Sequence, residues 1–476
     1  MMTLTGTILL AVVTADFTAE TGRIRPELHS SGFGPQICSC SSNDLAAIRA
    51  MGFKASRTHD WAIINPGQCV CDYYHIFPLK HLDAKDPKNY VFAQTDYLLK
   101  RTREELGHDV FFRLGTSIEH SGNKVHFNAA IPDDFDKVAE VFAGTVRHYN
   151  RGWADGFNWG IKYWEIWNEP DGGSTMWCLP EGDKAENGDK EEQKRRDLKR
   201  RDLFVKFFVT CLKRLKTEFP EAKVGGPAMC DMNRDYFRAL LAGCKEAGVR
   251  PDFISWHHYV DAPDWIIGEI NAARKLCDEF GFTDCELIVN EWHYFNYDLY
   301  GWAELRSPDP EIQKRVWSGP GSHNGIDSSC FNLTLLSKFQ HSCLSQGYYY
   351  GCNNRGSWGF KDAMNVKYKV FYGLCLFGEM MRGYTRMFAS TDDGTVSTLA
   401  AASSDGRKRA LLVTDYRGKG LEVSVDVKGI PADAKASVRI HDYTHDCAPV
   451  DFTFADGKLV LKKTDAQSAA FLITFD

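Results

Sequence analysis

Short apolar runs alternate with amphipathic stretches eight times between residue 31 and residue 381 of this chain. The apolar runs have the length of buried strands, and they cover residues 31–36, 53–58, 109–115, 161–167, 222–227, 252–259, 286–290 and 347–352. The stretches between them have helical spacing and cover residues 45–51, 95–106, 135–149, 204–215, 236–247, 265–280, 333–344 and 368–381. Eight successive strand–helix units predict an α/β fold, a (β/α)8 TIM barrel.

The pattern of apolar segments and turn residues changes after about residue 382. Short alternating segments at 410–414, 421–427, 436–441, 458–461 and 469–473 are separated by Asp-Gly, Lys-Gly and Pro, which is typical of an antiparallel β-sandwich. Residues 3–24 show the same pattern of short alternating segments. We therefore expect N-terminal strands in 1–27 that join the sandwich, a (β/α)8 barrel in 28–381 and a C-terminal β-sandwich in 382–476.

Two strand patterns end on a glutamate. The fourth runs into WNEP at 167–170, and because proline cannot donate to a sheet, the strand must stop there and leave Glu169 at its carboxyl end. The seventh ends at Asn290 and is followed by Glu291. In a parallel barrel all carboxyl ends meet at one rim, where active sites are built. One such glutamate could be a solvated loop residue, but two side by side bring no structural benefit, so we interpret them as functional.

A pair of carboxylates across a barrel mouth is the arrangement that cleaves glycosidic bonds. One group protonates the leaving oxygen, and the other stabilises or attacks the developing oxocarbenium ion. Glu169 and Glu291 belong to the fourth and seventh strands, on opposite sides of the mouth. We expect the spacing of a retaining enzyme, about 5 Å.

Other strand ends also carry polar or aromatic side chains. These are Arg57, His59 and Asp60 at the second strand, His257 and Tyr259 at the sixth, and Trp358 after the eighth. His59 could equally be a hydrogen-bonded core histidine, and Asp60 could cap backbone amides. His257 and His258 are adjacent on a strand and point to opposite faces, which argues against a metal site built from both.

The two glutamate motifs resemble those of the clan A glycoside hydrolases. With Phe-Arg-Leu-Gly-Thr-Ser-Ile at 112–118, Ile-Ser-Trp-His-His-Tyr at 254–259 and the flanking β domain, nearly the whole chain resembles glycoside hydrolase family 39. The resemblance implies that Glu169 is the general acid/base and Glu291 the nucleophile. Asn168 would then hydrogen-bond the sugar 2-hydroxyl.

The same resemblance suggests roles for the remaining rim residues. Tyr259 and Arg57 would keep Glu291 ionised and oriented, because interactions with the charged form lower its pKa. The residues expected to contact the sugar are His59, Asp60 and His257 for its hydroxyls and Trp358 as the apolar platform under the ring.

The sugar itself stays open at this stage. We expect a retaining, exo-acting, β-xylosidase-like enzyme, with an α-L-iduronidase-like or arabinose-releasing enzyme of the same clan, or an endo-acting one, as alternatives. An iduronidase needs cations at the rim, and Arg355 and Lys361 near the eighth strand would supply them. A non-catalytic carbohydrate-binding barrel is an alternative of another class, although it predicts loss of one glutamate.

Charge favours a carbohydrate partner. With 57 basic and 63 acidic residues the net charge is −6, which suggests neither nucleic acid nor an anionic membrane surface as a partner. No apolar run reaches the 18 or so residues of a membrane span. We expect no cofactor, and the oligomeric state stays open, a homo-oligomer included.

The cysteines indicate free thiols more than disulfides. Their number, 15, is odd, and they are spread through core patterns, which favours a reducing, cytoplasmic compartment over secretion after signal removal. The pairs Cys38/Cys40 and Cys69/Cys71 lack the spacing of structural zinc sites, so we expect no metal.

Overall fold

A computed structural model describes residues 11–476 except 33, 35–39, 61–68, 119–127, 183, 186, 187, 354 and 432. Its central feature is a closed barrel of eight strands in which every pair is parallel. In barrel order these are β2 (Ser30–Ser31), β3 (Ala55–Arg57), β4 (Asp109–Leu114), β5 (Tyr163–Ile166), β6 (Lys223–Met229), β7 (Phe253–Val260), β8 (Glu286–Tyr294) and β9 (Gln346–Tyr349). The predicted barrel is confirmed.

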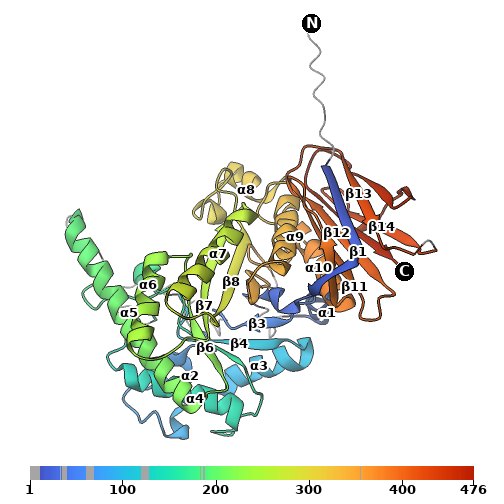
Figure 1. Ribbon diagram of the computed structural model, residues 1–476. Helices are drawn as coiled ribbons and strands as arrows, with labels where there is room; N and C mark the ends of the chain where they lie inside the picture. Colours follow the sequence, from blue (N-terminus) through green and yellow to red (C-terminus); the bar gives the residue numbers. More distant parts are fainter. Residues whose placement is uncertain are drawn as a thin grey trace.

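Helices surround the barrel in the described part of the chain (Figure 1). They are α1 (Ser42–Met51), α2 (Tyr73–Ile76), α3 (Ala93–Leu106), α4 (Phe135–Arg151), α5 (Lys190–Glu218), α6 (Arg234–Glu246), α7 (Pro263–Glu279), α8 (Pro310–Trp317), α9 (Ile326–Gln340) and α10 (Lys369–Gly383). The apolar stripe predicted at 204–215 lies on α5, and Phe204, Phe208 and Leu215 are fully buried in it.

Three features of the barrel differ from the sequence expectation. The charged stretch before residue 201 is helical from Lys190, so α5 begins well before its apolar stripe and its first turns project from the barrel (Figure 1). Strand β8 continues to Tyr294, four residues beyond the predicted end at Asn290. Helix α8 was not predicted, because its eight residues include a single buried one, Val316, and so show no apolar stripe.

The accessory domain is one continuous sheet of ten strands. Its order is β15 (Ala448–Pro449), β14 (Ala436–His441), β18 (Ala469–Phe475), β12 (Arg409–Asp415), β11 (Val396–Ala402), β10 (Arg386–Ser390), β1 (Ala11–Arg23), β13 (Glu422–Lys428), β17 (Lys458–Lys462) and β16 (Phe454–Ala455). The accessory β domain is confirmed, with two differences in detail: its strands form one hydrogen-bonded sheet, and β1 pairs with β13 in parallel.

Strand β1 connects the beginning of the chain to this C-terminal sheet. It pairs with β10 on one side and β13 on the other, and Figure 1 shows it as a single blue strand among red ones. Val13, Ala15 and Phe17 enter the apolar core of the sheet. We propose domain boundaries at 1–27, 28–381 and 382–476, since the last barrel helix ends at Gly383 and β10 begins at Arg386.

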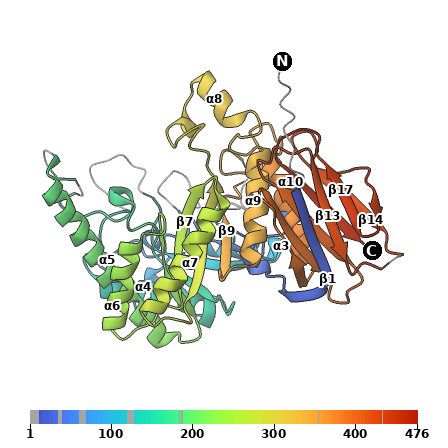
Figure 2. The same ribbon diagram turned by 45° about the horizontal axis from the view of Figure 1, so that its top comes forward.

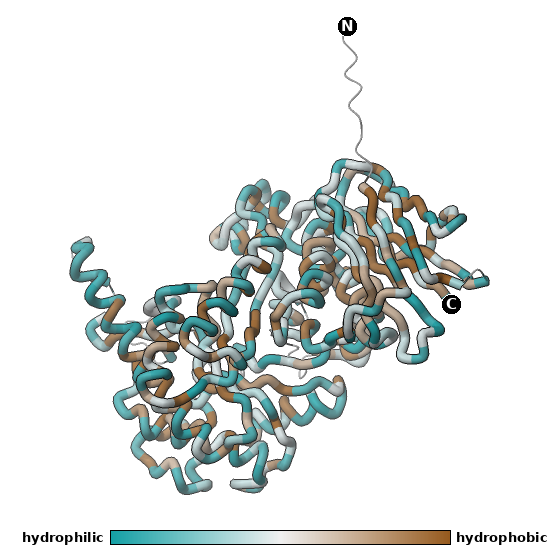
Figure 3. The backbone as a smooth tube through the Cα atoms, viewed as in Figure 1, coloured by the Kyte–Doolittle hydropathy of each residue, from teal (hydrophilic) through white to brown (hydrophobic). Residues whose placement is uncertain are grey.

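Helices α9 and α10 lie between the barrel and the accessory sheet (Figure 1). Ser329 on α9 contacts His441 on β14 at 2.9 Å, and Ser397 on β11 donates to Thr334 on α9 at 3.2 Å. Nearly every residue of α9 is buried, because it contacts barrel on one side and sheet on the other. In Figure 3 hydrophobic segments run through both parts.

Within the described residues, no helix combines the length and apolarity needed to cross a membrane.

Removing β1 tests this assembly. Deletion of residues 1–23 separates β10 from β13 and exposes the core around Phe17, so we expect aggregation or a markedly lower melting temperature by differential scanning calorimetry. The control lacks only residues 1–10 and keeps every described strand, and it should melt near the intact protein. Equal melting of all three proteins would contradict the role of β1.

Candidate active site

Glu169 lies on strained backbone just beyond β5. The strand ends at Ile166, and Trp167 and Glu169 then adopt positive φ angles of 75° and 46°. Such angles are costly for residues with a side chain and persist only where surrounding contacts hold them. The Trp167 amide donates to the Leu114 carbonyl at 2.6 Å, and the Glu169 amide donates to the Ala228 carbonyl at 2.8 Å. Neighbouring strands therefore fix the direction of Glu169.

Glu291 follows an irregularity in β8. Against β7, Val289 pairs with Trp256 and Glu291 with His257, so Asn290 is one extra residue between the two pairs. A bulge of this kind redirects the side chains beside it and is common near active sites. It allows β8 to deliver Glu291 to the mouth and still continue to Tyr294.

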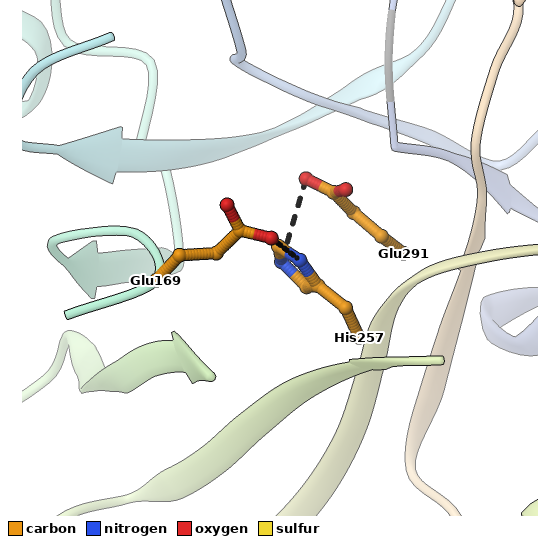
Figure 4. Close-up of side chains that lie close together, drawn as sticks. All are labelled: Glu169, His257 and Glu291. Carbon is orange, nitrogen blue, oxygen red and sulfur yellow. Dashed lines mark hydrogen bonds and ion pairs between the residues drawn. The ribbon is translucent and has the colours of Figure 1, made fainter. Parts of the chain in front are cut away.

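The two carboxylates converge on one histidine (Figure 4). His257 Nδ1 lies 2.8 Å from Glu169 Oε1, and its Nε2 lies 3.4 Å from Glu291 Oε1. One oxygen of each glutamate and one nitrogen of His257 lie within 4.8 Å of one another. Burial disfavours the charged imidazolium, but the charges of Glu291 and Glu169 outweigh it and raise the pKa of His257.

Three groups hold Glu291 in its ionised form. Arg57 Nη1 donates to Oε1 at 2.8 Å, His59 Nε2 lies 2.8 Å from the same oxygen, and the Tyr259 hydroxyl donates to Oε2 at 2.6 Å. Burial alone would raise the pKa of Glu291. The nearby His257, His59 and Arg57 outweigh it and hold that pKa well below the usual range.

Arg57 is itself fixed by a carboxylate that the sequence analysis did not single out. Its Nε donates to Glu165 Oε2 at 2.7 Å, and its Nη2 donates to Asn168 Oδ1 at 2.7 Å. The second oxygen of Glu165 accepts from Ser255 Oγ at 2.6 Å and Asn290 Nδ2 at 2.7 Å. All these side chains are buried. The guanidinium is thus shared among three acceptors and cannot turn away from Glu291.

Asp60 belongs to a second buried network, next to His59. Its Oδ1 accepts from Arg113 Nη1 at 2.9 Å and lies 3.5 Å from His59 Nδ1. Burial opposes its charged form, but His59 and Arg113 outweigh this and lower the pKa of Asp60. Arg113 Nη2 donates to Asp72 at 2.9 Å, and burial raises the pKa of Asp72 to about 7. Asp60 therefore orients Arg113 and places a negative charge beside His59.

A cavity of about 510 Å³ opens in front of these groups. Of the predicted residues, its lining contains Glu169, Glu291, His59, Tyr259 and Trp358. The other lining residues were not predicted: Ile118, Cys230, Asp231, His258, Tyr297, Trp302, Arg306 and Tyr350. Tyr350 directly follows β9, so its position at a strand end was a usable signal. The lining residues that lie in long loops, such as Trp302 and Arg306, showed no sequence signal of this kind.

The predicted residues outside this lining are buried against other protein groups. Arg57 donates to the Asn168 side-chain oxygen. The Asn168 Nδ2 group has no hydrogen-bond partner in the described part of the chain, so it can donate to a ligand. His257 and Asp60 lie outside this lining, where His257 contacts Glu169 and Glu291 and Asp60 accepts from Arg113.

Arg355 and Lys361 lie elsewhere. Lys361 is buried against Asp44 of α1 and also donates to Asn365 at 3.0 Å, while Arg355 donates to Asn365 at 3.1 Å. Both line a separate cavity beside α1. The expectation that they supply rim cations is therefore corrected: their partners are Asp44 and Asn365.

Glu169, His257 and Glu291 form the one group of described residues whose ligand atoms converge closely enough for a metal ion. Arg57 already occupies Glu291 Oε1 at 2.8 Å, so a cation would compete with a guanidinium there. Cys69 and Cys71 are buried free thiols, and Cys38 lies outside the described residues.

Sequence comparison finds a distant similarity over about half of the chain. No protein-family model matches the chain. A "Beta-xylosidase" of Geobacillus stearothermophilus is 23% identical over 254 residues, which is 52% of this chain and 43% of that protein, so the match spans less than half of the relative.

Solved structures share the fold over nearly the whole chain. A glucosidase from Croceicoccus marinus superposes with a TM-score of 0.74 at 18% identity, covering 98% of this chain and 99% of that one. A monomeric beta-xylosidase from Caulobacter crescentus CB15 gives 0.64 at 14% identity, with 98% and 99% covered. An alpha-L-arabinofuranosidase from Thermotoga maritima gives 0.65 at 12% identity, with 97% and 99% covered. At these identities the likeness establishes the fold.

The Arg57 network makes a prediction about stability. Arg57→Met leaves Glu165 and Glu291 buried without their cation, so we expect the free energy of unfolding in urea at pH 7 to fall by about 3–5 kcal/mol. Arg407→Met is the control, because Arg407 is exposed and lies 3.7 Å from an exposed Asp405, and it should change stability by less than about 1 kcal/mol. A loss below about 1 kcal/mol for Arg57→Met would show that the network is not stabilised in this way.

Proposed function

We propose that this protein is a retaining glycoside hydrolase that removes a terminal sugar by double displacement. The observation that carries the proposal is the pair Glu169 and Glu291, with oxygens and His257 within 4.8 Å of one another at the mouth of a (β/α)8 barrel. That proximity fits retaining enzymes, whose carboxyl groups lie about 5 Å apart, and not inverting ones at about 6.5–9.5 Å.

In the first step Glu169 donates its proton to the glycosidic oxygen while Glu291 attacks the anomeric carbon. The bond to the leaving group breaks, and an ester forms between the sugar and Glu291. The ionised state of Glu291, maintained by Arg57, His59 and Tyr259, is the state that a nucleophile requires.

In the second step Glu169, now a carboxylate, takes a proton from water. The water attacks the anomeric carbon, the ester breaks, and Glu291 is restored as a carboxylate with the anomeric configuration retained. His257 lies between the two glutamates, and in its protonated state it can donate to Glu169. This contact orients the Glu169 side chain for both proton transfers.

The substrate that we favour is a β-xyloside, and the finer family assignment that we favour is glycoside hydrolase family 39. The Geobacillus relative is a beta-xylosidase by name, and two of the structural neighbours are a beta-xylosidase and an alpha-L-arabinofuranosidase. An iduronidase-like activity is less favoured, because Lys361 is paired with Asp44 away from the cavity. The presence of both glutamates disfavours a purely sugar-binding barrel.

A panel of 4-nitrophenyl glycosides tests the function. We expect turnover of the β-D-xylopyranoside or the α-L-arabinofuranoside, with the substrate's anomeric configuration in the first product by ¹H NMR. Glu291→Gln should lower kcat by about 10⁴-fold or more, because the nucleophile is lost. The control Glu379→Gln alters a half-buried ion pair with Arg439 on the accessory sheet, at 2.7 Å, and should leave kcat unchanged. Inversion of configuration, or full activity of Glu291→Gln, would contradict the mechanism.

The Tyr259 hydrogen bond makes a prediction about pH. Tyr259 donates to the ionised form of Glu291, so it contributes to the low pKa of that carboxylate. Activity requires ionised Glu291 and is lost as pH falls through its pKa. Tyr259→Phe should therefore move the acid limb of kcat/KM to higher pH, measured between pH 3 and 9.

The matched control is Tyr443→Phe, an exposed tyrosine of the accessory domain, which should leave the limb in place. An acid limb of kcat/KM that does not move in Tyr259→Phe would show that this hydrogen bond does not control the ionisation of Glu291.

A further inference from the structure

The outer part of the active-site cavity is built by a segment to which no role has been given. Tyr297, Trp302 and Arg306 line the cavity together with Glu169 and Glu291, and all three come from the connection between β8 and α8. Tyr297 and Trp302 are 55% and 47% exposed, although they are large aromatic residues. Exposed aromatic side chains that line a cavity mark a surface for an apolar ligand face.

This segment has a small apolar core of its own. Phe295, Tyr300, Leu305 and Val316 form a separate buried cluster, and the segment stands out beyond the barrel around α8 in Figure 2. Trp302 stacks on Phe295 with ring centres 4.6 Å apart and an interplanar angle of 28°. The Trp302 ring is thus held in place with part of its surface exposed.

The edge of Trp302 continues the aromatic wall of the inner cavity. Its ring centre lies 5.2 Å from that of Tyr259 and 5.9 Å from that of Trp358. Tyr259 is the residue that donates to Glu291. The outer aromatic surface is therefore continuous with the groups around the reacting carboxylates.

Arg306 adds a positive charge to this surface. It ends a short 3-10 helix, Glu304–Arg306, and its side chain forms no ion pair with any described carboxylate. The nearest acids in sequence are engaged with backbone amides: Glu304 accepts from the Gly301 amide at 3.0 Å, and Asp309 accepts from the Glu311 amide at 2.9 Å. The guanidinium is available to a ligand.

The proposed reaction places the leaving group toward the open end of the cavity that these residues line. The Glu291 side chain is 4% exposed and that of Glu169 is 21% exposed. Because Glu169 protonates the leaving oxygen in the proposed function, the departing part of the substrate lies on the more open side of the pair, toward the cavity mouth.

We propose that Tyr297, Trp302 and Arg306 form a leaving-group subsite for an aglycone that combines a flat apolar face with a carboxylate. The two rings supply stacking surface, and Arg306 binds the carboxylate, for which its planar fork of donors is suited. Asp231 also lines the cavity, and the charged neighbours that act on it are Glu269 and His258, so among the described residues it does not neutralise the Arg306 guanidinium. This inference rests on the proposed hydrolase function.

The test compares two aryl glycosides of the sugar that is turned over best, one with a 4-carboxyphenyl and one with a 4-carbamoylphenyl leaving group. They differ in charge and little in shape. The ratio of kcat/KM for the acid over the amide is measured for the wild type and Arg306→Met, so intrinsic leaving-group reactivity cancels between the proteins. We expect the ratio to fall by about three- to tenfold in Arg306→Met, with partial recovery in Arg306→Lys.

The matched control is Arg355→Met, because Arg355 is exposed but lines the separate cavity beside α1. It should leave the ratio unchanged. Trp302→Ala should raise KM for both glycosides alike, because stacking does not depend on the charge. An unchanged ratio in Arg306→Met would overturn the subsite.

A binding measurement separates this inference from the proposed function. If the wild type turns over no member of the 4-nitrophenyl glycoside panel, the hydrolase function fails, and the subsite is then tested by titration calorimetry with 4-hydroxybenzoate and 4-hydroxybenzamide. Preference for the benzoate that is lost in Arg306→Met supports the subsite. Equal affinity for both compounds, or a preference that persists in Arg306→Met, overturns it.

Discussion

One buried guanidinium sets the charge balance of the candidate active site. Arg57 gives separate donors to Glu165, Glu291 and Asn168, each at 2.7–2.8 Å. Two carboxylates can share this interior only because a cation lies between them, and the cation stays there only because both bind it. Together with His257 and His59, Arg57 lowers the pKa of Glu291 and leaves it ionised in a place where burial alone would keep it protonated.

The barrel strands fix the positions of the charged groups in this network. Arg57 ends β3, Glu165 lies within β5, and Glu291 follows the bulge at Asn290 in β8, so three strands contribute to one network. The positive φ of Glu169 is held by the carbonyl of Ala228, which lies in the neighbouring strand β6. His257 on β7 then links Glu169 to Glu291. The reacting pair is therefore positioned by the sheet, while leaving-group selection is assigned to the loop that carries Trp302 and Arg306.

Much of the fold could be predicted from sequence, because strand and helix periods are local. All eight barrel strands were anticipated, and WNEP correctly predicted the end of β5, since proline cannot continue a sheet. Glu165 was missed because a glutamate inside an apolar strand shows no sign of its partner, and Arg57 is distant in sequence. The end of β8 was misplaced because a bulge leaves no local signature. Arg306 lies in a loop whose shape depends on the packing of Phe295 and Leu305, which no periodicity reveals.

The central claim is that Glu291 is an ionised nucleophile paired with Glu169 as acid/base. Mass spectrometry of the protein after incubation with a 2-deoxy-2-fluoro glycoside carrying a dinitrophenyl leaving group tests it most directly, because such a compound allows the ester to form and slows its hydrolysis. We expect a mass increase of one fluoro-sugar, located on the peptide that contains Glu291 and absent in Glu291→Gln. A fluoro-sugar bound at Glu169 or any other residue, or no adduct on a protein that hydrolyses the parent glycoside, would contradict the account.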